Sequence, residues 1–223
     1  MYSGVYHDVT YQSIASALSS PFMIGSMVLV PFMCKKVGLE KLIRYSLLIG
    51  GAICAALFGL HLVMDVHPLV HGVLLGLGSG FAMVSIQMQW GLVGEAIDYN
   101  EFITGKRTEG SIYGTFNLSR RIGQTIGNSA AVLALGWIGY DTALADAGMA
   151  QAAGTLTGIK VLCVLVPGIF VIGSWFAFKK VWNITPELRE KMGKANLMAV
   201  QKFSTETVIK EMQNIYAAEL LGN

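Results

Sequence analysis

The segment that decides the fold is "LVGEAIDYNEFITGKRTEGSIYGTFNLSRRIGQTIG", residues 92–127. Its first half places four acidic and two basic residues in and around a short loop: Glu95, Asp98, Glu101, Lys106, Arg107 and Glu109. Its second half enters an apolar stretch that nevertheless contains Arg120 and Arg121. The question raised by the sequence is why an apolar chain places charge there.

The composition indicates an integral membrane protein built from α-helices. Hydrophobic residues make up 53% of the 223 residues, and only 13% are charged, against about 25% in a soluble domain. The net charge of +2 is too small to indicate a nucleic-acid partner. The three cysteines are far apart and lack the spacing of metal ligands or of a disulfide framework.

Five stretches are long and apolar enough to cross a bilayer, which takes about 20 residues of helix. They cover residues 12–33, 43–64, 69–95, 111–139 and 157–180. Pro21 and Pro31 predict a kink or a boundary in the first. The polar tail after Trp182 predicts one or two amphipathic surface helices, the first starting near Thr185.

Lysine and arginine gather on alternate connections, which predicts the orientation in the membrane. One side has Lys35, Lys36, Lys41, Arg44, Lys106, Arg107 and the basic residues of the tail. The other side, "MDVHP" and "GYDTALADAGMAQAAGTLTG", has none. We therefore expect a protein integral to the cytoplasmic membrane of a prokaryote, with an external N-terminus and a cytoplasmic C-terminus. Five spans are an odd number, which indicates a missing partner helix.

Glycine recurs at four-residue spacing, as it does where membrane helices pack closely. Gly72, Gly76 and Gly80 follow this spacing on the third stretch, and Gly123 and Gly127 follow it on the fourth. The glycines therefore predict helix–helix contacts along both stretches.

The fourth stretch has a polar face, here called the polar stripe: Asn117, Arg121, Gln124 and Asn128. Their spacing places them on one side of an α-helix. Such a stripe is costly against lipid, so we expect it to face protein or a water-filled cavity. Arg121 lies about 15–20 Å of helix from the loop at Glu109, too far to reach the membrane surface cheaply. Arg120 lies about 100° away from Arg121 on the helix. It leaves the stripe unless it reaches a neighbour or snorkels toward the cytoplasm.

The charged loop predicts a second functional feature. Its acids and bases are close enough to form an ion-pair cluster that breaks and re-forms as helices rock, although a solvated loop without a role is the alternative. Gln89 on the third stretch is a further candidate for lining a cavity. No enzyme motif is present: His61, His67 and His71 lack a carboxylate that would complete a metal set, and no catalytic residue, metal ligand or cofactor is expected.

The segment from Glu95 to Gly127, followed by "LALGWIGYD", resembles the glycoside–pentoside–hexuronide:cation symporter family, which includes the melibiose and glucuronide carriers. The resemblance rests on Asp98–Glu101, "TGKRTEG" at 104–110, "RRIGQ" at 120–124 and "GYD" at 139–141. It implies an all-α major-facilitator bundle in which these five spans are helices eight to twelve. It also implies three parts: an external segment or helix end at 1–11, a five-helix half-bundle at 12–180, and a cytoplasmic tail at 181–223.

The resemblance implies a sugar or glycoside substrate, Na⁺ or H⁺ as coupling cation, and a partner that supplies the N-terminal half with most of the cation site. The family's basic residue of helix eleven, usually lysine, falls on Arg121. The polar pair of the melibiose branch falls on Phe116 and Asn117, and its tryptophan falls on Ile86, which argues against melibiose. The alternative is a truncated, non-transporting membrane protein or a membrane interaction subunit.

Overall fold

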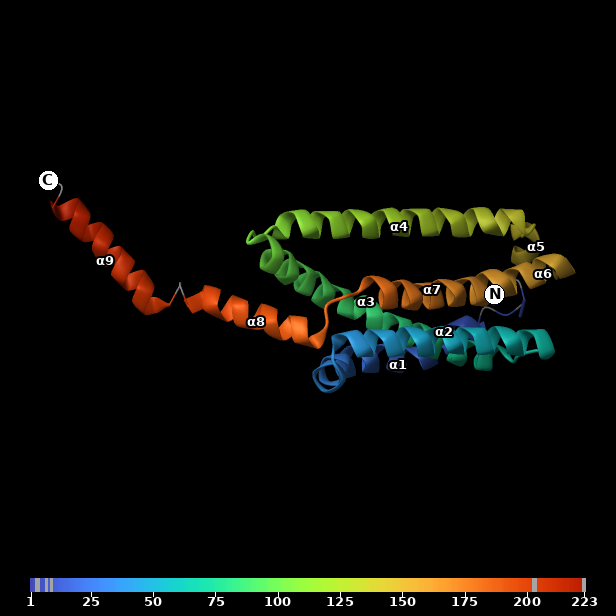
Figure 1. Cartoon of the computed structure of the whole chain (residues 1–223). Helices are drawn as coiled ribbons and strands as arrows, with labels where there is room; N and C mark the ends of the chain where they lie inside the picture. The colour runs from blue at the N-terminus through green and yellow to red at the C-terminus, as the bar shows by residue number, and fades with distance from the viewer. Residues whose placement is uncertain (3–4, 7, 9, 202–203, 222–223) are drawn as a thin grey trace. The chain divides into compact units, whose positions relative to one another are not determined.

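The structure is a computed structural model that describes residues 1–223 except 3–4, 7, 9, 202–203 and 222–223. All regular secondary structure in the described residues is helical (Figure 1). The elements are α1 (Thr10–Val37), α2 (Leu39–Val63), α3 (Pro68–Thr104), α4 (Glu109–Trp137), α5 (Thr142–Asp146), α6 (Ala153–Lys160), η1 (Val161–Leu165), α7 (Val166–Val181), α8 (Pro186–Gln201) and α9 (Thr205–Leu221).

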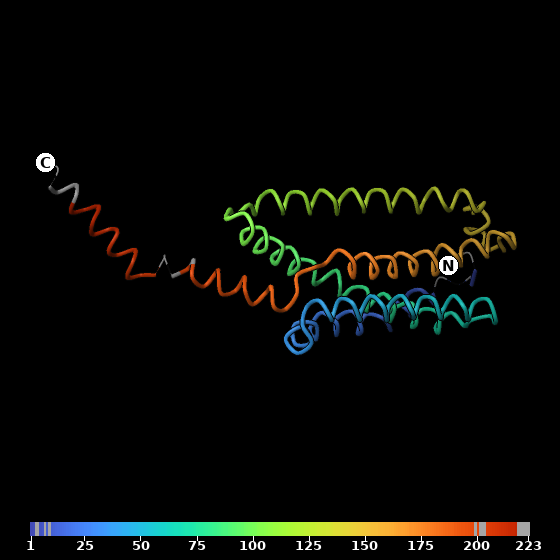
Figure 2. Tube along the Cα trace, in the orientation of Figure 1, coloured from blue at the N-terminus to red at the C-terminus, as the bar shows by residue number. Residues whose placement is uncertain are grey.

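Four helical runs are long and apolar enough to cross a membrane: α1, α2, α3 and the continuous run Ala153–Val181. That run joins α6, the π-helical turn η1 and α7, and its trace passes through all three without a break (Figure 2). α4 is long enough to span a bilayer, but its polar residues keep it outside this group of apolar helices. Four of the five predicted spans are thus present, and a membrane-spanning α4 stays a prediction.

Helix α1 continues through both of its prolines. Of the predicted kink or boundary, the boundary is therefore wrong, and the kink stays a prediction. Proline has no N–H and leaves the carbonyl four residues earlier without its helical donor. At Pro21 that carbonyl belongs to Ala17, and the hydroxyl of Ser20 donates to it at 2.8 Å. A serine therefore replaces the missing backbone donor, as is common in membrane helices.

The chain forms two compact units, which are described separately. Unit 1 comprises residues 1–92 and 115–182, and unit 2 comprises residues 93–114 and 183–223. In unit 1, α2 and α7 lie side by side (Figure 1). Their contact is an apolar cluster of Leu39, Ile43 and Leu47 with Val171, Trp175 and Phe178. This helix pair forms the best-packed part of unit 1.

The glycine pattern of α3 marks its contact with α1 inside unit 1. A Cβ atom on Gly72 would collide with the Ala15 side chain, and one on Gly76 would collide with the Ser19 side chain. The Ser19 hydroxyl also lies 3.3 Å from the carbonyl oxygen of Gly72. The close helix packing predicted for these two glycines is confirmed. Gly123 and Gly127 of α4, in contrast, have no such neighbour among the described residues.

The "GYD" motif after α4 is a turn that ties α4 to α6 within unit 1. Gly139 has φ 70°, a backbone conformation that other residues rarely adopt. Asp141 caps α5 by accepting from the N–H groups of Ala143 and Leu144.

The start of α6 is hydrogen-bonded to this turn. The Thr155 hydroxyl donates to the Ile138 carbonyl at 2.9 Å. Gln151 exchanges two hydrogen bonds with the backbone of Asp141, at 3.0 and 2.7 Å.

Unit 2 consists of the end of α3, the loop that follows it, the start of α4 and the tail. Helix α8 begins at Pro186, and the Thr185 hydroxyl accepts from the N–H of Leu188 at 3.2 Å, an N-cap of the kind the sequence predicts. Arg189 of α8 donates to Glu95 of α3 at 2.8 Å. The tail thus forms two helices, α8 and α9, and the first is ion-paired to α3.

Candidate functional site

The polar stripe lies on a helix that is open to its surroundings. No residue of α4 is buried against the rest of the described chain. Arg121, Gln124 and Asn128 are exposed, whereas Asn117 is half-buried. The structure therefore places the stripe on one face of a single helix, and three of its four members are exposed.

The face of α4 next to the stripe contacts α3. The rings of Trp90 and Phe116 meet edge to face with centroids 5.3 Å apart. The guanidinium carbon of Arg120 lies 5.8 Å from the centroid of the same Trp90 ring, within the range of a cation–π interaction. Of the two alternatives that the sequence left open for Arg120, the structure shows the contact with a neighbour.

The two adjacent arginines therefore have different environments. Arg120 is half-buried, with its Nε atom shielded from solvent, whereas Arg121 is exposed. Sequence patterns did not indicate Trp90, because its contact with Arg120 joins residues on separate helices. Gln89, the remaining candidate for a cavity, is half-buried on α3.

The predicted ion-pair cluster forms in unit 2 around one cation. Arg107 donates to Glu101 at 2.6 Å and lies 3.4 Å from Asp98. It also forms a short hydrogen bond through its Nε atom to Glu109. Because Asp98 and Glu101 belong to the end of α3 and Glu109 begins α4, Arg107 links the ends of two helices.

The backbone of the loop is fixed by its own hydrogen bonds. Gly105 follows the last residue of α3 with φ 67° and donates to the carbonyl of Glu101 at 2.8 Å, a common way to end a helix. The amide of Asn100 then donates across the loop to the Thr108 hydroxyl at 2.9 Å. Arg107 is thereby held opposite the acids of α3.

Two predicted members of the cluster lie elsewhere. Glu95 pairs with Arg189 of α8 instead of Arg107. Lys106 forms no ion pair in the part of the chain that the structure describes, and its carbonyl accepts from Asn100 and Thr104. The cluster therefore consists of Arg107 with Asp98, Glu101 and Glu109, here called the Arg107 cluster.

Electrostatics favour the charged form of this arginine. Hydrogen bonds to Glu109 and Glu101 raise the pKa of Arg107 above its ordinary value. Its guanidinium stays protonated at every working pH, so the cluster contains one fixed cation against three acidic side chains. Among the described residues, no group of three or more His, Cys, Asp or Glu side chains is placed to hold a metal ion.

Helices that are long and apolar enough to cross a bilayer define a class, that of α-helical integral membrane proteins. The family model described as MFS/sugar transport protein matches residues 5–179. The chain belongs to this family of major-facilitator sugar transport proteins, which is a family of carriers and not of enzymes.

Curated relatives agree with this assignment. The chain is 29% identical over 159 residues to the glucuronide carrier protein homolog of Escherichia coli, covering 71% of this chain and 32% of that protein. It is 28% identical over 169 residues to an uncharacterized symporter of Bacillus subtilis, covering 74% and 35%. The isoprimeverose transporter of Lactiplantibacillus pentosus is 27% identical over 200 residues, covering 86% and 40%. The chain thus spans about a third to two fifths of the length of these relatives.

Proposed function

We propose that this chain provides the C-terminal half of a cation-coupled sugar or glycoside symporter, in which the polar stripe of α4 lines the transport path. One observation supports the proposal above the others. Helix α4 exposes Arg121, Gln124 and Asn128, and the chain belongs to a family of membrane transport proteins. Polar side chains at membrane depth need protein or water around them, and the N-terminal half of the carrier would supply both.

The substrate we propose is a sugar or glycoside with an acidic group. One relative is named for a glucuronide, a sugar derivative that bears a carboxylate. The guanidinium of Arg121 is permanently charged and offers donors in a planar fork, which suits a carboxylate or paired hydroxyl groups. Asn117, Gln124 and Asn128 on the same helix face add neutral donors and acceptors for sugar hydroxyls.

The Arg107 cluster is proposed as a gate on the cytoplasmic side. It joins the end of α3 to the start of α4 through ion pairs that are half-exposed to solvent. Ion pairs this exposed to solvent are weak, so the helices can exchange them without a large barrier. Contacts of this strength suit a carrier whose halves rock between two states.

Transport in this proposal requires the other half of the bundle. That half would complete the sugar site and hold most of the site for the coupling cation, Na⁺ or H⁺. The N-terminus would lie outside and the tail helices in the cytoplasm, as the distribution of lysine and arginine predicts.

The experiment compares two proteins in proteoliposomes. The first is this chain alone, and the second is the chain joined to the first half of the glucuronide carrier homolog. Uptake of a labelled glucuronide is measured under a Na⁺ gradient and, separately, under a proton gradient. We expect accumulation by the joined protein under one of the gradients and none by the chain alone. Accumulation by the chain alone would contradict the proposal.

A further inference from the structure

Two histidines form a buried pair at the end of unit 1 where α2 ends and α3 begins. The Nε2 atom of His61 lies 2.9 Å from the Nδ1 atom of His71. The rings meet nearly edge to face with centroids 5.1 Å apart. His61 is 6% exposed and His71 is 0% exposed. This contact joins the last turn of α2 to the first turn of α3 and is separate from the polar stripe and the Arg107 cluster.

The pair also anchors the first residues of the chain. The rings of Tyr2 and Tyr6 each have their centroid 5.8 Å from that of His71. The hydroxyl of Tyr6 is shielded from solvent and has no hydrogen-bond partner among the described residues. Burial raises the pKa of this phenol, so Tyr6 remains a neutral donor. His71 therefore connects three segments of unit 1.

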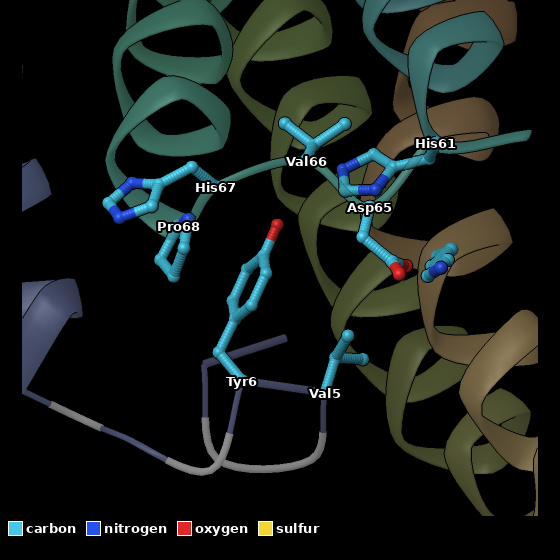
Figure 3. A pocket seen from close by; sticks show the side chains of 8 residues that line it. Val5, Tyr6, His61, Asp65, Val66, His67 and Pro68 are labelled. Carbon is cyan, nitrogen blue, oxygen red and sulfur yellow. The ribbon is translucent and has the colours of Figure 1, made fainter. Parts of the chain in front are cut away.

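A cavity of about 310 Å³ adjoins the pair. In Figure 3 the Tyr6 ring stands between His67 and Pro68 on one side and Asp65 and His61 on the other. The titratable or charged groups around the pair are the Met1 amino group, Tyr2 and Tyr6 from the N-terminal segment, Asp65 and His67 from the α2–α3 connection, and Lys160 from α6.

The hydrogen bond between the two rings depends on pH because it depends on how many protons the rings bind. A hydrogen bond between two imidazole nitrogens contains one proton, so one ring donates and the other accepts. The pair keeps this bond when it is neutral, and also when the donating ring takes a proton on its other nitrogen. When both rings are protonated, two N–H groups face each other and the bond is lost. The second proton would also place two cations in a buried site beside Lys160.

We propose that the His61–His71 pair is a proton-binding site that closes this end of the bundle while one of its rings is neutral and opens it when both rings are protonated. Opening would release the Tyr2 and Tyr6 contacts and widen the adjoining cavity to water. The closed form binds fewer protons than the open form, so by linkage closure is stable at higher pH and is lost as the pH falls. The proposal stands whether or not the polar stripe lines a transport path.

Hydrogen exchange of the purified chain in lipid nanodiscs tests this directly. The amides to follow are Met64, bonded to Leu60, and His71, bonded to His67. Exchange is measured at about pH 7.5 and about pH 5, a range in which histidine is the main titrating side chain. Rates are divided by those of an unstructured reference peptide. We expect the equilibrium constant for opening to increase about tenfold or more between the higher and the lower pH. A difference of one pKa unit between the open and closed forms gives a change of this size.

Two substitutions distinguish the effect of the histidine pair from the effect of other titrating groups. In His71→Gln the amide side chain still fills the site and bonds His61 but cannot titrate, so the pH dependence of opening should vanish. His67→Gln is the matched control, because His67 is an exposed ring of the same connection. It should keep the full pH dependence. Unchanged pH dependence in His71→Gln, or its loss in His67→Gln, would overturn the proposal.

A second measurement on the unsubstituted chain covers the case in which His71→Gln fails to fold. Ring-nitrogen NMR follows each histidine during an acid titration. We expect His61 and His71 to titrate as a coupled pair in two steps, with the second step accompanied by the increase in exchange. Independent single-step titration of both rings, at the pH at which His67 titrates, would contradict the proposal.

Discussion

The guanidinium of Arg120 stacks over the ring of Trp90, 5.8 Å from its centroid, while the next residue on the helix, Arg121, is exposed. Adjacent arginines on α4 therefore have different surroundings: Arg120 contacts Trp90 of α3, whereas Arg121 is exposed. The proposed function assigns Arg121 to a ligand or to another part of a carrier.

The first prediction concerns this contact. Arg120→Ala and Trp90→Ala should each destabilise the chain, and the double variant should lose less than the sum. The coupling should be about 0.5–2 kcal/mol, the range for a cation–π pair that is partly desolvated. Chemical unfolding of the four proteins in detergent measures it. Strictly additive losses would show that the two side chains do not interact.

The second prediction concerns the Arg107 cluster. Arg107→Ala removes the shared cation and leaves Asp98, Glu101 and Glu109 as neighbouring negative charges, so the end of α3 should loosen. Amide hydrogen exchange in residues 98–110 should speed up several-fold, most clearly at low salt, because salt screens charges at this exposure. Lys106→Ala is the matched control: it removes one positive charge from the next position and should leave exchange nearly unchanged. Equal effects of the two substitutions would show that net charge, and not this geometry, holds the loop.

The third prediction concerns the contact between α3 and α1. Gly76→Ala should destabilise the chain by about 1–3 kcal/mol, the cost of overpacking a close contact, because the new Cβ would meet the Ser19 side chain. Gly80→Ala is the control on the same helix face: its Cβ would lie 3.9 Å from Phe22, and alanine favours helix more than glycine does by about 1 kcal/mol. Thermal unfolding of both variants measures the two changes in stability. A destabilised Gly80→Ala together with a neutral Gly76→Ala would contradict the packing.

The fourth prediction is the topology. Reporter fusions after Lys36, Lys106 and Lys191 should report a cytoplasmic position, and fusions at Asp65 and Asp146 an external one, because lysine and arginine remain on the cytoplasmic side. An external signal at Lys106 would reverse the orientation and remove the cytoplasmic role proposed for the Arg107 cluster.

The sequence predicted what depends on local pattern. Apolar length located the helices, four-residue glycine spacing located the contact between α3 and α1, and charge density located the Arg107 cluster. The polar stripe followed from helical periodicity alone. The resemblance at 95–141 predicted the family, which the match over residues 5–179 confirms.

What the sequence could not predict depends on contacts between separate helices. His67 is the histidine closest to His71 in the sequence, but the structure pairs His71 with His61 across the α2–α3 connection. Glu95 likewise lies outside the Arg107 cluster, because it pairs with Arg189, which is 94 residues away in the sequence. Of the kink or boundary predicted at Pro21, the boundary is wrong, because the hydroxyl of Ser20 donates to the carbonyl that proline leaves without its helical donor.

The central claim, that the polar stripe faces a water-filled transport path, is tested most directly by cysteine labelling. With Cys34, Cys54 and Cys163 replaced by serine or alanine, single cysteines are placed at Arg121 and, as the matched control, at Ile122, an exposed apolar neighbour off the stripe. The joined carrier in proteoliposomes is treated with a charged, membrane-impermeant thiol reagent, with and without substrate. We predict rapid labelling at position 121 that substrate slows, and slow labelling at position 122 that substrate does not change. Equal labelling at both positions, with no protection by substrate, would show that Arg121 faces lipid or packing contacts and that the path does not run along α4.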